Sequence, residues 1–342
     1  MAQVNDIGID LGTSQVLIFQ RGRGIVLREP AVVAVDRDSS KILAVGNEAY
    51  RLIGRTPGNV QAVRPLRHGN ILDLTLTQHM LHDFTAQVIG RHLFARPRAV
   101  MSVPTAVSET EKRQLMNIMF DAGMRKTQLL DRPIAAALGV GLHFSEAYGS
   151  MIIDMGAGAT DIAVLSMGDI AVANCIPLGG DSFDDAIIRY LRKKHNLLIG
   201  ERTAEEIKIS LGTAIPPSDR IEMEVTGRNL LSGLPKTQNI NSQEIFEALK
   251  DAVNDMIEAI QSVIERTPPQ LASDIFDEGI VLTGGASQLA GLADAIYQIL
   301  GIACGVADDP QTCVVAGCGK ALEDPQGMKD YLGDGRHYWS RR

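Results

Sequence analysis

Two similar aspartate–glycine turns, far apart in the chain, constrain the fold more than any other feature. The first reads Asp10-Leu11-Gly12-Thr13-Ser14, and the second reads Asp154-Met155-Gly156-Ala157-Gly158. In each, an apolar run leads into the turn, glycine permits it and another apolar run leads out, which is typical of strand, turn and strand. Asp10 and Asp154 hold equivalent places, 154 − 10 = 144 residues apart. The repeat therefore predicts two similar halves that face each other across a cleft.

The residues of these turns indicate what such a cleft binds. Backbone N–H groups in glycine turns bind phosphate oxygens, and paired carboxylates hold a hydrated divalent cation. A third turn, Thr283-Gly284-Gly285, follows a further apolar strand and would let the backbone approach a nucleoside closely. The sequence thus predicts a clamp for a metal–nucleotide complex, with Asp10 and Asp154 on the metal side.

The remaining pattern alternates short apolar runs with amphipathic segments, which predicts two α/β domains, each with a mixed sheet flanked by helices. Small inserted regions are expected at about 33–65 and 182–245. Capping boxes are expected at Ser108–Glu111 and at Thr203–Glu206, each opening a helix. Further helices are predicted over 244–266 and 287–300.

Composition bounds the class of protein. The 342 residues are enough for about two domains, and 45% hydrophobic with 22% charged residues is ordinary for a globular chain. The net charge of −8 disfavours nucleic acid as a partner and weakly opposes anionic lipid, so membrane contact would need a local device. Nothing before Ile7 reads as a signal peptide, and no stretch approaches the ~20 apolar residues of a bilayer span. We therefore expect a cytoplasmic protein.

One such local device is the segment Arg91–Arg98, where Leu93 and Phe94 stand among three arginines. It can be a helix end whose two apolar side chains fold inward. It can also be a loop that inserts Leu93 and Phe94 into the acyl boundary while arginines meet lipid phosphates. The residues alone leave both interpretations open.

Glu205 and Lys208 stand three apart on one predicted helix, so they share a face. They can form a surface ion pair of little energetic worth. In a cleft they could instead hold a ribose hydroxyl or an adenine edge. Spacing does not decide between these alternatives.

Several stretches across about residues 4–322 resemble the actin superfamily and, within it, the MreB family of bacterial actins. The most specific are Gly54-Arg55-Thr56-Pro57-Gly58-Asn59 and Gly200-Glu201-Arg202-Thr203-Ala204-Glu205-Glu206. The turns at Asp10, at Asp154 and at Gly284 agree with them. These stretches favour MreB over actin-fold sugar kinases and over DnaK-type chaperones. A chaperone of that type would also need a long substrate domain after the nucleotide domain.

The resemblance implies an actin-like ATPase fold that binds ATP and Mg²⁺ and forms paired filaments at the inner face of the cell membrane. Such filaments organise cell-wall synthesis and rod shape, with MreC, MreD and RodZ as partners and no nucleic acid. Four subdomains are implied: 1–32 with 66–145 and 318–335 (IA), 33–65 (IB), 146–181 with 246–317 (IIA), and 182–245 (IIB).

The resemblance also implies roles for single residues. Asp10 and Asp154 are the metal-side carboxylates, and Leu93 and Phe94 fall on the membrane-insertion loop. Nucleotide contacts are implied for Gly12, Thr13, Ser14, Gly156, Gly158 and Thr160 on the phosphate side, and for Glu205, Lys208, Gly284 and Gly285 on the nucleoside side.

The chain departs from the family where hydrolysis is concerned. The family has a glutamate before Pro133, thought to orient the attacking water, whereas this chain has Arg132, preceded by Asp131. The second turn has Ala159 where the family has a threonine, which leaves Thr160 as its hydroxyl. A positioned acid or base contributes about 10²–10⁴-fold to a rate, so we expect at most a slow ATPase, with Asp131 and Thr160 as the remaining catalytic candidates.

Two other functions stay open on the sequence. An actin-fold kinase of a small metabolite would need a base near the γ-phosphate, for which Asp131 and Asp181 are candidates. A nucleotide-binding adaptor that no longer polymerises would keep the cleft and lose the filament. ADP production stimulated by hydroxylated metabolites would indicate the kinase, and sedimentation with ATP separates the adaptor from a filament.

Overall fold

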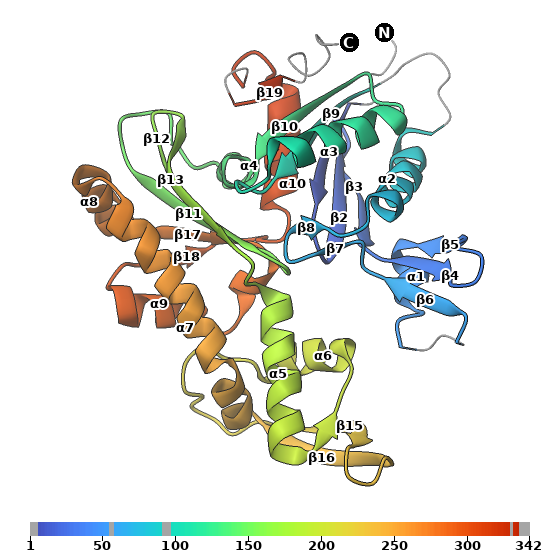
Figure 1. Cartoon of the computed structure of the whole chain (residues 1–342). Coiled ribbons are helices and arrows are strands. Elements are labelled where there is room, and N and C mark those ends of the chain that lie inside the picture. Colours follow the sequence, from blue (N-terminus) through green and yellow to red (C-terminus); the bar gives the residue numbers. More distant parts are fainter. Residues whose placement is uncertain (1–5, 55–57, 91–96, 329–330, 335–342) are drawn as a thin grey trace.

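Two large mixed sheets form the centre of the molecule (Figure 1). The computed structural model describes residues 6–54, 58–90, 97–328 and 331–334. The first sheet has the order β19-β10-β9-β1-β2-β3. Its strands are β1 (Ile7–Leu11), β2 (Gln15–Gln20), β3 (Gly24–Pro30), β9 (Arg98–Val103), β10 (Lys126–Asp131) and β19 (Gly333–Asp334).

The second sheet repeats the first in strand order and direction. Its order is β13-β12-β11-β17-β18, formed by β11 (Ser150–Met155), β12 (Thr160–Ser166), β13 (Asp169–Ile176), β17 (Ile280–Thr283) and β18 (Cys304–Val306). In each sheet an antiparallel meander, β1-β2-β3 or β11-β12-β13, continues into two parallel strands, β9-β10 or β17-β18. The predicted duplication of α/β domains with mixed sheets is confirmed.

Helices α4 (Arg132–Val140) and α10 (Cys313–Glu323) form an apolar layer that both sheets share (Figure 1). The two helices cross closely because glycine stands at each contact. A Cβ on Gly139 would overlap the carbonyl oxygen of Cys313, and one on Gly317 would overlap that of Ala135. Side chains from both sheets, such as Val100 and Ile152, complete this layer, so it joins the two halves.

The other helices cover the outer parts of each half. The first half carries α2 (Leu74–Ile89) and α3 (Glu109–Asp121), and α3 begins at the predicted capping box of Ser108 and Glu111. The second half carries α5 (Gly180–His195), α7 (Ser242–Arg266), α8 (Pro269–Glu278) and α9 (Leu292–Leu300). Helix α7 confirms the helix predicted over 244–266, and its apolar stripe packs into the core of the second half.

Two small sheets extend from the large ones and fall inside the predicted insertions (Figure 1). The first is built by β4 (Val33–Asp36), β5 (Ile42–Val45) and β6 (Val60–Val63), beside α1 (Gly46–Tyr50). The second is built by β14 (Leu197–Leu198), β15 (Glu222–Asn229) and β16 (Pro235–Asn241), near α6 (Glu201–Leu211). A hairpin of β7 (Leu66–Arg67) and β8 (Asn70–Ile71) returns the chain to the first half.

Two predicted helix starts are wrong. Helix α6 begins at Glu201 with Gly200 as its N-cap, so Thr203 lies inside the first turn and caps nothing. Glu201 and Arg202 are good helix formers, which lets the helix start three residues earlier than predicted, at an N-cap of 200 and not 203. The helix expected from Ser287 is split into a 3₁₀ turn, η1 (Gly285–Gln288), and α9, because Gly291 has a φ of 69° that an α-helix cannot contain.

Candidate functional site

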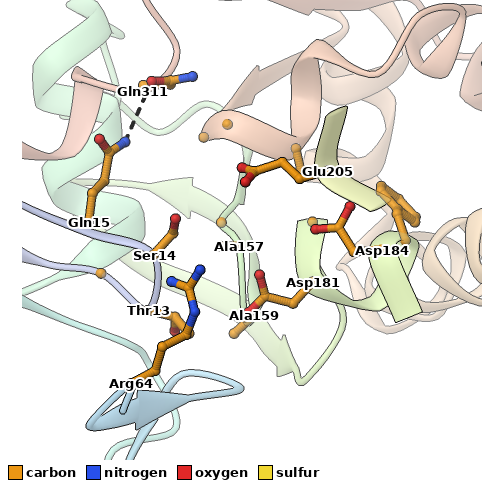
Figure 2. A pocket seen from close by; sticks show the side chains of 18 of the residues that line it. Thr13, Ser14, Gln15, Arg64, Ala157, Ala159, Asp181, Asp184, Glu205 and Gln311 are labelled. Atoms are coloured by element: carbon orange, nitrogen blue, oxygen red, sulfur yellow. Dashed lines mark hydrogen bonds between the residues drawn. The ribbon is translucent and has the colours of Figure 1, made fainter. Parts of the chain in front are cut away.

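A cavity of about 1000 Å³ lies between the two halves, with walls from both large sheets, from β6 of the first small sheet and from α6. Figure 2 shows Thr13, Ser14 and Arg64 on one side of it, and Asp181, Asp184 and Glu205 on the other. This volume suits a ligand of nucleotide size. Of the residues predicted to hold nucleotide or metal, the structure brings the following to the cavity wall: Asp10, Gly12, Thr13, Ser14, Asp154, Gly156, Gly158, Glu205, Lys208, Gly284 and Gly285.

The two glycine turns have the same internal hydrogen bond. The N–H of Gly12 donates to the carbonyl oxygen of Gln15 at 3.1 Å, and that of Gly156 donates to the carbonyl oxygen of Ala159 at 2.9 Å. The turns also approach each other, because a Cβ on Gly158 would lie 2.6 Å from Oγ1 of Thr13. Glycine at 158 is thus required by the close approach, and the duplicated turns meet at the cavity as the sequence predicted.

Asp10 and Asp154 end equivalent strands and have equivalent partners. Oγ of Ser102, on the neighbouring parallel strand β9, donates to Oδ1 of Asp10 at 2.8 Å. Oγ1 of Thr283, on the equivalent strand β17, donates to Oδ1 of Asp154 at 2.9 Å. Both carboxylates are buried. Each half therefore places one oriented carboxylate at the floor of the cavity.

The Arg132 side chain lies among the carboxylates of both halves. Its Nη2 is 3.3 Å from Oδ1 of Asp10, its Nε is 3.9 Å from Oδ2 of Asp154 and its Nη1 is 4.0 Å from Oδ2 of Asp161. Nη2 also donates to the carbonyl oxygen of Leu11 at 3.2 Å. The side chain is only 8% exposed, and it lines the cavity. A single guanidinium thus connects the two duplicated hairpins.

Burial and neighbouring charges shift the pKa values of Arg132 and Asp154 in opposite directions. Burial alone would lower the pKa of Arg132, but the carboxylates of Asp10, Asp161 and Asp154 outweigh it and raise that pKa above its ordinary value. Burial also raises the pKa of Asp154, which the charge of Arg132 opposes. Arg132 is therefore a permanent positive charge at the floor of the cavity.

This arrangement does not fit a divalent cation bound directly by both aspartates. Mg²⁺ needs oxygen ligands at about 2.1 Å in near-octahedral geometry, and the guanidinium occupies the space between the two carboxylates. In the part of the chain that the structure describes, no group of three His, Cys, Asp or Glu side chains is arranged to hold a metal ion. The expected ion and the resident arginine therefore compete for the same two carboxylates.

On the opposite wall, the Lys208 side chain is already paired. Its Nζ is 2.9 Å from Oδ1 of Asp184 and donates to the carbonyl oxygen of Gly180 at 3.1 Å. Burial raises the pKa of Asp184 to about 7, and the nearby Lys208 opposes this shift. Glu205 and Lys208 both line the cavity, and the contacts of Lys208 with Gly180 and Asp184 join α6 to α5.

Two hydrogen bonds join residues that line the cavity from opposite halves. The hydroxyl of Tyr50 donates to Oε2 of Glu205 at 3.5 Å. Nε2 of Gln15 donates to Oε1 of Gln311 at 3.5 Å, drawn as the dashed line in Figure 2. These contacts join residues 155 and 296 positions apart in the chain.

The two candidate catalytic residues, Thr160 and Asp131, do not line the cavity. The hydroxyl of Thr160 is buried and donates to the carbonyl oxygen of Leu178 at 2.7 Å, away from the wall. Asp131 is the N-cap residue of α4 and is not among the lining residues. Leu93 and Phe94 lie outside the described residues.

The sequence reasoning missed the roles of Asp161 and Asp184. Asp161 accepts hydrogen bonds from the backbone and the hydroxyl of Thr105, both at 3.0 Å, and Asp184 pairs with Lys208. Asp184 stands four residues after Gly180 at the start of a helix, and Asp161 opens the outgoing strand of the second turn. A charged residue directly before the apolar run 162–165 was the signal available for Asp161.

None of the described helices combines the length and apolar character needed to cross a bilayer.

Comparison with known proteins gives consistent relatives. The family model described as "MreB/Mbl protein" matches residues 4–330. The chain is 44% identical to the cell shape-determining protein Mbl of Bacillus subtilis (strain 168), over 93% of this chain and 96% of that protein. It is also 44% identical to the cell shape-determining protein MreB of Escherichia coli (strain K12), over 93% of each.

Solved structures of related proteins have the same fold as this chain. MreB5 of Spiroplasma citri bound to AMPPNP superposes with a TM-score of 0.90 at 31% identity, covering 95% of this chain and 97% of that one. A MamK double helical filament has a TM-score of 0.76 at 21% identity, covering 93% and 98%, and supports the fold alone. The predicted actin-like fold is confirmed.

Proposed function

Because the chain belongs to the MreB/Mbl protein family, we propose that it is an actin-like cell-shape protein that binds ATP in its central cavity and assembles into filaments. One structural observation supports the proposed binding of ATP. The duplicated turns at Gly12 and Gly156 meet across a cavity of about 1000 Å³, where their backbone can cradle phosphates.

The relatives support the ligand and the assembly. MreB5 of Spiroplasma citri is bound to AMPPNP in one structure and to ADP in another. MamK forms a double helical filament. The bound nucleotide would touch both halves and thereby set the angle between them, which biases the contacts between subunits.

The finer division and location belong to the same proposal. We assign subdomains IA (1–32, 66–145, 318–335), IB (33–65), IIA (146–181, 246–317) and IIB (182–245). We place the filament at the inner face of the cell membrane, with Leu93 and Phe94 as the inserted pair. Family resemblance supports this location and the cell-wall partners MreC, MreD and RodZ.

Hydrolysis is proposed to be slow. Arg132 stands where the family has a glutamate, and a guanidinium cannot accept a proton from an attacking water. The hydroxyl of Thr160 is committed to the carbonyl oxygen of Leu178. Arg132 occupies the space between Asp10 and Asp154, where a bridging magnesium ion would otherwise lie.

Sedimentation of the purified full chain on anionic liposomes, with and without ATP, tests this function. We expect ATP-dependent pelleting of ordered filaments that electron microscopy resolves on the lipid, and little phosphate release. Leu93→Ser with Phe94→Ser should abolish liposome pelleting while filaments still form in solution. Nucleotide binding without filaments would indicate the adaptor instead, and ADP production stimulated by hydroxylated metabolites would indicate the kinase.

A further inference from the structure

We propose that Arg132 is a built-in cation that takes the place of a divalent metal between Asp10 and Asp154, so that nucleotide binding by this chain depends little on Mg²⁺. The inference rests on the proposed nucleotide-binding function and specifies the ionic requirement of that same cavity.

The geometry places one fixed positive charge against carboxylates from both halves. Asp10 comes from β1, whereas Asp154 and Asp161 come from β11 and β12. Arg132 reaches all three within 4.0 Å from the start of α4. A metal ion that bridges the halves would need these carboxylates, and the guanidinium already holds them.

Binding of a divalent ion between these carboxylates would be energetically unfavourable while Arg132 is present. It would have to dehydrate, approach a permanent positive charge in a buried site and displace that charge from its partners. Arginine cannot relieve the repulsion by losing its proton. The guanidinium also donates a hydrogen bond to the carbonyl oxygen of Leu11 at 3.2 Å, which its displacement would break.

The guanidinium keeps donor capacity for a ligand. Nε of Arg132 is buried and has no hydrogen-bond partner, and its contact with Asp154, at 3.9 Å, is beyond hydrogen-bond distance. The side chain lines the same cavity as the two glycine turns. A phosphate oxygen held by those turns would meet a planar, permanently charged donor group, the kind that binds phosphate well.

The test is the affinity for AMPPNP, measured by calorimetry on the full chain in excess MgCl₂ and in EDTA. For the natural sequence we expect the two dissociation constants to agree within about threefold. For Arg132→Gln, which removes the charge, we expect them to differ by at least about tenfold, within the usual range of coupling between two ligands. Arg132→Lys should keep a ratio near that of the natural sequence.

A second readout needs no nucleotide. MgCl₂ should leave the thermal unfolding midpoint of the natural chain unchanged, and should raise that of Arg132→Gln, because an ion that binds only the folded state stabilises it. Arg98→Gln is the matched control. It removes a guanidinium 2.6 Å from the buried Asp6, outside the cavity, and should leave the Mg²⁺ ratio unchanged.

The outcomes separate the two proposals. AMPPNP binding by the natural chain that weakens tenfold or more in EDTA overturns the role of Arg132 and leaves the proposed function standing. No AMPPNP binding in either condition overturns the proposed function and this inference with it. The ratio of the two dissociation constants of the natural chain is sufficient to test the role of Arg132, so the test does not require the variants to fold.

Discussion

Asp161 holds the position in the second hairpin that Leu17 holds in the first. Leu17 pairs with Asp10 across β1 and β2, and Asp161 pairs with Asp154 across β11 and β12, each seven residues after its partner. The duplicated hairpins are therefore unequal in charge. One buried carboxylate comes from the first half and two from the second, and Arg132 lies among them.

Asp161→Asn tests that charge asymmetry. The amide keeps the shape and an acceptor oxygen for Thr105, but Arg132 loses one of its three counter-charges. We expect the free energy of unfolding to fall by about 1.5–3 kcal/mol, the range for hydrogen bonds to charged groups. Urea denaturation measures it. Asp255→Asn, on an exposed position of α7, is the control and should change stability by less than about 0.5 kcal/mol. An equal effect of both variants would argue against the asymmetry.

Gly158→Ala tests the close approach of the two turns. The added Cβ would lie 2.6 Å from Oγ1 of Thr13 and 2.8 Å from the backbone nitrogen of His68, so the turns must separate. We expect the affinity for AMPPNP to fall by at least about tenfold, or 1.4 kcal/mol. Calorimetry measures this loss.

The control for Gly158→Ala is Gly305→Ala on β18, where an added Cβ meets nothing within 4 Å. Its affinity should match that of the natural chain. Unchanged binding by Gly158→Ala would mean that the turns do not need to meet in order to hold the ligand.

Asp184→Asn tests the titration of a buried carboxyl beside Lys208. Asp184 has a pKa of about 7 in the folded protein against an ordinary value of 3.8. The folded state thus retains a proton that the unfolded state has lost. The stability this contributes is fully present below pH 3.8 and is lost as the pH rises through about 7.

Asparagine cannot titrate, so the stability of Asp184→Asn relative to the natural chain should increase as the pH rises from about 4 to about 7. Chemical denaturation in nucleotide-free buffer at several pH values gives the difference. A difference that is flat with pH, or that decreases, contradicts the raised pKa. Asp219→Asn, whose side chain is exposed, serves as the reference variant.

Gly317→Ala tests the crossing of α4 and α10. The new methyl group would overlap the carbonyl oxygen of Ala135, in the layer that both sheets share. Overpacking of a core costs about 1–3 kcal/mol, which exceeds the roughly 1 kcal/mol that alanine gains over glycine in a helix. We expect net destabilisation in thermal or urea unfolding. A stabilised Gly317→Ala protein would show that the helices can separate without cost.

Local sequence patterns determined much of this protein. The Asp–Gly turns at Asp10 and Asp154, with apolar runs on both sides, were enough to predict the duplicated hairpins and the cavity between them. The capping box at Ser108 and the apolar stripe of 244–266 likewise predicted α3 and α7. Such patterns succeed because turn preference, capping and amphipathic spacing act between residues close in the chain.

Only the tertiary structure decided where the charges lie. Arg132 is 122 residues from Asp10 in the chain, and Lys208 is 24 residues from Asp184 on another helix. The sequence marked Arg132 as the loss of a glutamate, yet its three carboxylate partners emerged only when both hairpins closed on α4. The hydroxyl of Thr160 turned inward to Leu178 for the same reason. Long-range pairs are set by how sheets and helices pack, and no local preference encodes that packing.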